Sequence, residues 1–366
     1  MAAALALTAC STGGTQDDAG EVDSAYFASV QEKVEGLKAP QTDLPPTGGP
    51  EAVPNKSVVI VTITMAEDSA KRLTEALDSA AKAIGWDSTI YDGQGSATIA
   101  NDKLQQAVTT RPDGIVLVAL DKTTVGAGLA AADAAGIPVS CSFCWDLGAE
   151  DGKGPYADVE PSLETVANMG RASAEYAFVA TDGHPRYLQL NDPSLSNLIT
   201  RQSGLEDFID ECQSSGGDCK LVASQDFQVA DATTTLPAAA ATLARANPDF
   251  NVIWAGFDFA GLQIISGLRQ AGLTSGDSTF LVSSGGDGAN LKLIADGGYQ
   301  KASTAISYEW TGYAGIDNLN RIFAGQEPID QNIPIRLFDK SNAGSAQGAW
   351  ISDSDFKAAY LEQWHG

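Results

Sequence analysis

Histidine and positive charge are both scarce in this chain. Its 366 residues include two histidines, His184 and His365, and 22 Lys and Arg residues against 47 Asp and Glu, a formal net charge of −25. Two histidines so far apart in the sequence argue against a zinc site built on histidine and against a Ser-His-Asp triad. A surface this acidic repels phosphate backbones, so we expect no nucleic-acid partner. The charge instead suits an exported protein.

Motifs for membrane spanning and catalysis are missing as well. No stretch reaches the roughly 18 apolar residues of a transmembrane helix, and no G-x-x-x-x-G-K-[ST] phosphate loop occurs. Gly126 and Gly128 have the G-x-G spacing of a dinucleotide site, but residues 121–125 separate them from the preceding strand, which favours close packing of a helix on the sheet. Residues 352–355 lack the glycine turn and distal glutamate of a calcium loop. We therefore predict no enzyme activity, no cofactor and no metal.

The first of the chain's five cysteines follows an apolar start. MAAALALTAC ends in small residues before Cys10, and a polar run, STGGTQDDAG, comes next. This pattern resembles a bacterial lipoprotein signal in residues 1–10, with Cys10 as the lipidated residue. No Lys or Arg precedes the apolar run, so we expect the native start to lie upstream. The resemblance predicts an extracytoplasmic protein that contacts the membrane through its lipid anchor only.

The remaining cysteines form two local pairs. Cys212 and Cys219 bracket a short Gly- and Ser-containing loop, and Cys141 and Cys144 form a C-x-x-C motif. An even number of cysteines in an exported chain favours two structural disulfides. The alternative for the C-x-x-C motif is redox chemistry, but no convincing helix start follows it.

Strand and helix patterns alternate from Lys56 onward. Ile115 to Leu120 is an unbroken apolar run typical of a strand buried on both faces, an alanine-rich helix follows, and Ile137 to Cys141 is the next strand. Such a unit carries both strand ends to the same edge of a parallel sheet, where α/β proteins bind ligands. Repeated alternation of this kind predicts an α/β fold with doubly wound parallel sheets.

An internal similarity suggests two lobes. RPDGIVLVALD (111–121) resembles NPDFNVIWAGFD (247–258), and each is followed by a helix that a glycine ends. We predict a tether, short helix and Pro/Gly linker (11–55), a first lobe (56–157 plus 308–330), a second lobe (158–307 plus 331–340) and a C-terminal extension (341–366). Three chain crossings would form the hinge, and the ligand would lie between the lobes.

The predicted strand ends carry aromatic and polar side chains. Aromatic faces can stack on sugar C–H surfaces, while carboxylates, Asn and Arg can hold hydroxyls. The candidate ligand-binding residues are Glu67, Asp68, Asp121, Phe143, Trp145, Asn197, Arg201, Phe227, Phe257, Asp258, Asp287, Tyr308 and Glu309.

Several strings resemble the type I periplasmic binding proteins, specifically the ribose-type sugar-binding components of ABC transporters. They are AAGIPVS (134–140), ARANPDFNVIWAGFD (244–258), SSGGDG (283–288) and GYQKASTAI (298–306), in the family's order. The resemblance implies two Rossmann-like lobes, three crossings, a ligand held by hinge closure, and recognition by a membrane permease. It favours a monomer.

The resemblance also assigns ligand-binding roles by position. Asp287 matches the aspartate of the family's Gly-x-Asp-Gly turn, Asp258 keeps one member of an Asn-Asp pair, and Arg201, or Gln202 one residue on, matches a ligand-binding arginine. The chain departs from the family at 67–70 and at 143–145, where pyranose or furanose contacts are expected. We therefore predict a small ligand, a sugar or polyol first. The alternatives are a more apolar or aromatic ligand, a sensory subunit, and an exported C-x-x-C oxidoreductase.

Overall fold

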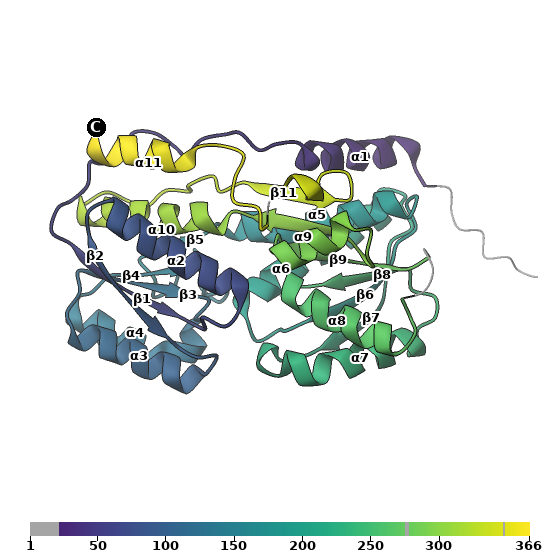
Figure 1. Ribbon diagram of the computed structural model, residues 1–366, viewed down its shortest axis with the longest axis horizontal. Coiled ribbons are helices and arrows are strands. Elements are labelled where there is room, and N and C mark those ends of the chain that lie inside the picture. Colours follow the sequence, from purple (N-terminus) through teal and green to yellow (C-terminus); the bar gives the residue numbers. More distant parts are fainter. Residues whose placement is uncertain (1–21, 275–277, 347) are drawn as a thin grey trace, which may run out of the picture.

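Two mostly parallel β-sheets form the centres of two lobes that lie side by side (Figure 1). The computed structural model describes residues 22–274, 278–346 and 348–366. The predicted signal, Cys10 and the start of the tether lie outside these residues. Among the described helices, none is long and apolar enough to span a membrane.

The first lobe has a five-stranded sheet in the order β2-β1-β3-β4-β5, and all of its pairs are parallel. Alternate residues of β1 enter different cores: Val58 and Ile60 pack with α2 and α10, whereas Val59 and Val61 pack with α3 and α4. The elements are β1 (Ser57–Thr62), α2 (Asp68–Ala83), β2 (Asp87–Asp92), α3 (Ala97–Thr109), β3 (Gly114–Val118), α4 (Lys122–Ala135), β4 (Val139–Ser142), β5 (Asp158–Glu160), α10 (Tyr308–Phe323) and α11 (Phe356–His365).

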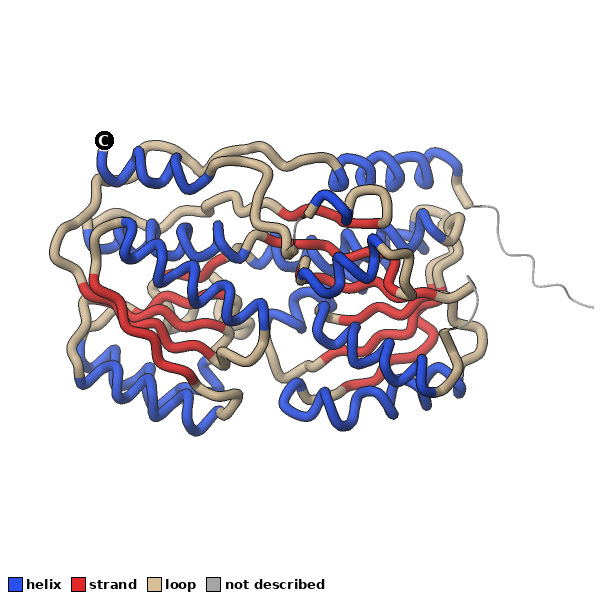
Figure 2. The backbone as a smooth tube through the Cα atoms, in the orientation of Figure 1, coloured by secondary structure: helices blue, strands red, loops and turns tan. Residues whose placement is uncertain are grey.

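The second lobe has a six-stranded sheet in the order β11-β10-β9-β8-β6-β7, in which only the pair β10–β11 is antiparallel. Helices cover both of its faces, with strands inside and helices outside (Figure 2). The elements are α1 (Ser24–Lys38), α5 (Leu163–Ala180), β6 (Arg186–Asn191), α6 (Ser196–Ser214), β7 (Lys220–Asp226), η1 (Val229–Asp231), α7 (Ala232–Ala246), β8 (Val252–Ala255), α8 (Asp258–Gln270), β9 (Phe280–Gly285), α9 (Gly288–Ala295), β10 (Gln300–Ile306), β11 (Ile335–Asp339) and η2 (Ala343–Ser345).

The chain crosses between the lobes after β5, after β10 and after α10. The first boundary differs from the sequence prediction, because β5 pairs with β4 and carries the first lobe to Glu160 rather than to residue 157. The three-residue strand was missed because a segment that short has no readable hydrophobic period.

The two ends of the chain form additional bridges. Helix α1 packs on the second lobe, and residues 39–55 then run to the first lobe. The C-terminal segment leaves β11 in the second lobe and ends in α11, which packs on α10 of the first. Figure 1 shows both ends along one side of the molecule. Residues 341–366 thus pack on both lobes instead of forming a separate extension: Ala343 and Trp350 lie against the second lobe, and α11 lies against the first.

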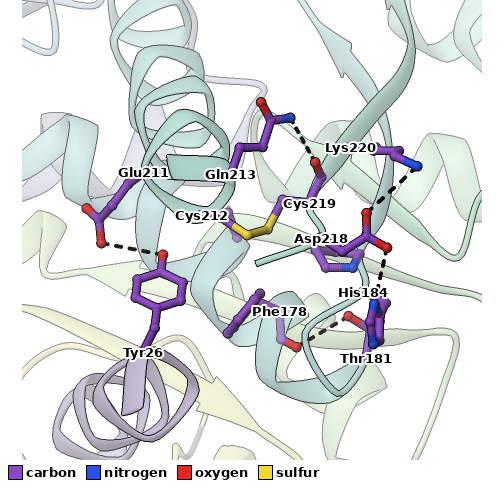
Figure 3. The surroundings of a disulfide bond; sticks show 12 residues. Tyr26, Phe178, Thr181, His184, Glu211, Cys212, Gln213, Asp218, Cys219 and Lys220 are labelled. Atoms are coloured by element: carbon purple, nitrogen blue, oxygen red, sulfur yellow. Dashed lines mark hydrogen bonds and ion pairs between the residues drawn. A yellow bond between two sulfur atoms is a disulfide. The ribbon is translucent and has the colours of Figure 1, made fainter. Parts of the chain in front are cut away.

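Both local cysteine pairs are joined. Cys212 and Cys219 link the end of α6 to the start of β7, with Cα atoms 6.1 Å apart (Figure 3). Cys141 and Cys144 are joined at the end of β4, with Cα atoms 5.8 Å apart, and both are buried. The second pair brackets Phe143, so it restrains the backbone that presents this ring.

Candidate functional site

A cavity of about 490 Å³ lies between the lobes at the carboxyl ends of strands from both sheets. This edge is where open α/β folds bind ligands. Ten of the polar and aromatic residues that line it are Glu67, Thr124, Phe143, Asp192, Asn197, Arg201, Gln228, Phe257, Phe259 and Tyr308. Six of these ten (Glu67, Phe143, Asn197, Arg201, Phe257 and Tyr308) belong to the set of predicted ligand-binding residues.

The first lobe's wall of the cavity includes two residues with left-handed backbone. Ala119 follows β3 with φ of 53°, and Phe143 follows β4 with φ of 60°. Non-glycine residues seldom adopt this conformation, which is common where strained loops form sites. It turns the chain sharply at the sheet edge. The ring of Phe143 then lies 5.5 Å from that of Tyr308, which begins α10.

The second lobe contributes Asn197 and Arg201, which lie one turn apart on α6. Arg201 is 3% exposed; its Nη1 donates to the carbonyl of Gly256 at 3.2 Å, and its guanidinium lies 5.8 Å from the centre of the Phe143 ring. Arg201 Nε and Asn197 Oδ1 are buried without a hydrogen-bond partner among the described residues. Both residues line the cavity.

A second cavity of about 470 Å³ shares Glu67 and Phe259 with the first. It brings together the predicted residues Asp68 and Asp287 with Arg72, which pairs with Glu309 through two hydrogen bonds of 3.1 and 2.9 Å. Arg72 Nη1 lies 3.9 Å from Asp287 Oδ1 across the two lobes. Burial raises the pKa of Asp287, and the nearby carboxylates of Asp258 and Glu67 raise it further, while Arg72 opposes the shift.

Two predicted aspartates use their carboxylates within the protein. Asp121 accepts from the backbone N–H of Ser196 at 2.9 Å and from its hydroxyl, so it joins the first lobe to the start of α6. Asp258 is 1% exposed and accepts from Ser283, Ser303, Gln300 and the backbone N–H of Asp287. Neither side chain lines the main cavity.

Three other predicted residues also lie outside the main cavity. Trp145 is buried in the first lobe's core, and its backbone N–H donates to the Ser196 hydroxyl at 3.0 Å. Phe227 is buried in the second lobe's core and packs against Phe257. Glu309 is held by Arg72. Ligand contact by these residues stays a prediction that the cavity does not support.

Several residues that line the cavity were not predicted from the sequence. Thr124, Gln228 and Phe259 are examples, and each lies within a few residues of a predicted strand end or helix start. Their positions close to strand ends were the one sequence feature that could have identified them as cavity-lining residues. Their residue types alone gave none, because such residues also occupy ordinary helix starts and turns.

The fold and the inter-lobe cavity define a class of two-lobed binding proteins whose ligand lies between α/β lobes. A family model described as "Periplasmic binding protein domain" matches residues 58–327. The chain belongs to this family and is a solute-binding protein, not an enzyme. No curated protein sequence matches it.

Solved structures share the fold at low sequence identity. An Agrobacterium vitis ABC transporter solute-binding protein with bound allitol is 18% identical, with a TM-score of 0.67 over 80% of this chain and 97% of that one. The arabinose-transporter component from Shewanella sp. ANA-3 is 19% identical, with a TM-score of 0.68 over 85% and 99%. A Mycobacterium smegmatis solute-binding protein with bound glycerol is 22% identical, with a TM-score of 0.67 over 81% and 99%. The type I periplasmic binding fold predicted from the sequence is confirmed.

Proposed function

We propose that this protein captures a sugar or polyol between its lobes and delivers it to an ABC importer. The observation that carries the proposal is the inter-lobe cavity, whose aromatic rings and polar groups come from both lobes. Rings of Phe143, Phe257 and Tyr308 offer apolar faces to a sugar ring, and Asn197, Arg201 and Gln228 offer hydrogen bonds to hydroxyls. Solved relatives of the same fold carry allitol or tagatose.

A thermal-shift screen over pentoses, hexoses and polyols tests this function. A ligand at about 100 times its Kd should stabilise the protein by roughly 2.7 kcal/mol, which gives a visible rise in Tm. Asn197→Ala should reduce that rise, because it removes a polar group from the cavity wall. Ser203→Ala, on the same helix but outside the cavity lining, is the matched control. A complete absence of stabilisation by this panel would reject a sugar or polyol as the ligand.

A more apolar ligand is the second candidate. Phe143, Phe257 and Phe259 lie in the lining together with Leu73 and Leu198, so much of the wall is hydrocarbon. Aromatic alcohols and acids therefore belong in the same screen. Stabilisation by an aromatic compound, with no response to any sugar or polyol, would favour this candidate.

The membrane attachment and the downstream partner complete the proposal. Lipidation at Cys10 would anchor the protein to the outer surface of the cytoplasmic membrane. The protein would act there as a monomer and pass its ligand to the permease. Cys10→Ser should move the protein from the membrane fraction to the soluble fraction. Loss of uptake of the identified ligand in a strain without the protein would separate transport from a purely sensory role.

A further inference from the structure

Arg201 is a buried cation that has no carboxylate partner among the residues that the structure describes. Among the described residues, no ion pair includes it, although it is 3% exposed and its Nε–H has no acceptor. Within the described part of the chain, its side chain donates one hydrogen bond, to the neutral carbonyl of Gly256. Burying a guanidinium without a countercharge is unfavourable, so a group in the cavity that supplies negative charge would be strongly favoured.

The carboxylates in the cavity wall are already engaged. Both oxygens of Glu67 accept hydrogen bonds from Ser69 and Ala70 and cap α2. Asp192 accepts from Ser194 through one oxygen and from the N–H of Val229 through the other. Neither ion-pairs with Arg201, and each is fixed by its own segment.

The residues around Arg201 indicate which other chemical groups the ligand carries. The Phe143 ring lies beside the guanidinium, and Phe257 and Tyr308 also line the cavity. Asn197 Oδ1, one turn before Arg201, is a buried acceptor without a donor among the described residues, which suits a ligand hydroxyl. The site therefore combines a guanidinium, a hydroxyl acceptor and apolar ring faces.

We infer that the ligand is an acidic sugar, a hydroxylated ring or chain that carries one carboxylate bound by Arg201. This assignment deepens the proposed function and rests on it. The carboxylate supplies the charge that the protein does not place beside Arg201, and a guanidinium holds it with paired N–H donors. The hydroxyls bind Asn197 and the polar groups around it.

Matched pairs of compounds test the assignment on the wild-type protein by calorimetry. The pairs are D-galacturonate and D-galactose, D-glucuronate and D-glucose, and D-gluconate and D-glucitol. At least one acid should bind about tenfold or more tightly than its neutral partner, since a charge-assisted pair contributes about that factor. Neutral partners that bind as tightly as their acids in every pair would overturn the inference and leave the proposed function standing. No binding by any of the three acids would also overturn the inference, whereas the proposed function is rejected only by the wider thermal-shift screen.

Arg201→Gln tests the residue itself. The preference for the acid should fall to within about threefold, because the remaining amide cannot distinguish a carboxylate from a hydroxyl by charge. Arg245→Gln removes the same charge from an exposed site on α7 and should leave the preference unchanged. A retained preference in Arg201→Gln would overturn the assignment. If that variant does not fold, Arg201→Lys, which keeps the charge without the forked donors, should still prefer the acid but bind it more weakly, and unchanged affinity there counts against the inference.

Discussion

Asp258 and Asp287 follow neighbouring strands of the second sheet, but their carboxylates face different surroundings. Asp258 receives hydrogen bonds from two serine hydroxyls, an amide side chain and a backbone N–H. Asp287 is 8% exposed, and its Oδ1 has no hydrogen-bond donor among the described residues. The first carboxylate therefore organises the lobe, while the second is held near a cavity.

Exchanging each of these carboxylates for an amide should separate the two roles. Asp258→Asn places an NH₂ group against donors that need an acceptor, so it should lower the free energy of unfolding by about 2–4 kcal/mol. Asp287→Asn removes a carboxyl whose pKa is raised by burial and by neighbouring carboxylates, so the unliganded protein should be no less stable at pH 7. Urea unfolding of both variants measures the difference. Equal losses in the two variants would contradict these roles.

A pair of buried carboxyls in β5 should make stability depend on pH. Burial raises the pKa of Asp158 from 3.8 to about 6, and burial beside Asp158 and Asp330 raises the pKa of Glu160. Between about pH 4 and pH 6, the folded chain thus keeps a proton on Asp158 that the unfolded chain has already released. The free energy of unfolding should fall as the pH rises through this range.

Unfolding in urea at pH 5 and pH 7.5 measures this dependence. Asp158→Asn, which keeps the shape and cannot ionise, should show a smaller difference between the two pH values than the wild type. Carboxyls with lowered pKa values, such as Asp113, make the free energy of unfolding rise with pH. They do so mainly below their ordinary pKa of about 4, and therefore outside the interval from pH 5 to pH 7.5. A wild-type protein that is more stable at pH 7.5 would contradict the prediction.

The sequence located the cavity better than it located individual contacts. Aromatic residues and Arg201 were predicted because parallel strands end at one edge, and this edge is the observed cavity wall. Asp121 and Asp258 occupy the same edge, but their hydrogen-bond partners come from α6 and from β9 and β10. Such long-range partners decide whether a carboxylate stays free, and a single sequence does not contain them.

At the scale of elements, two helix glycines allow α5 and α6 to meet closely. A Cβ on Gly204 would lie 1.9 Å from the carbonyl oxygen of Ala167, and one on Gly170 would lie 1.9 Å from that of Arg201. The backbones of the two helices therefore touch without side chains between them. Because Arg201 lies at this contact, the close approach also fixes the position of a cavity residue.

Gly204→Ala should destabilise the protein by about 2–4 kcal/mol, because the added methyl group must push the two helices apart. Gly126→Ala is the matched control, since a Cβ at Gly126 in α4 meets nothing within 4 Å and should stabilise by about 0.5–1 kcal/mol. Thermal unfolding of both variants tests the contrast. If Gly204→Ala is as stable as the wild type, the helices are not in tight contact.

Hydrophobic pattern predicted nearly every strand and helix, and the failures have local causes. Gly128 packs against Leu104 of α3, as its helix position suggested, whereas a Cβ added at Gly126 would meet nothing within 4 Å. Gly312 and Gly315 weaken the helical pattern near the start of α10. Gly312 is there because α2 approaches closely, with Ala76 2.6 Å from the site of a Cβ. A tertiary contact thus lowers the local helix signal.

At the scale of the whole molecule, the two chain ends support each other across the lobes. The backbone N–H of Ala52 donates to the carbonyl of Trp364 at 3.0 Å, and that of Gly49 donates to Gln363 Oε1 at 2.9 Å. Farther along, Gln41 and Arg336 both donate to Asp353.

The apolar face of α11 covers part of the first lobe. Phe356, Tyr360 and Trp364 are each 1–2% exposed and pack with Tyr313 and Trp310 of α10. Trp364 also donates its indole N–H to Asp317, which is fully buried. Removing α11 would therefore expose aromatic side chains and take a donor from a buried carboxylate.

A chain that ends at Asp355 should consequently unfold with a free energy lower by about 2–4 kcal/mol. Burial of three aromatic side chains contributes about 1.5–3 kcal/mol each, and the ordering entropy of the helix offsets part of that sum. Its urea m-value should also fall, because less surface is buried on folding. Leu361→Ala changes an exposed side chain on the same helix and should stay within about 0.5 kcal/mol of the wild type. Equal stability of the shortened chain and the 366-residue chain would mean that the packing of α11 on the first lobe does not stabilise the fold. The C-terminal segment from β11 to α11 would then have no part in holding the two lobes in their observed arrangement.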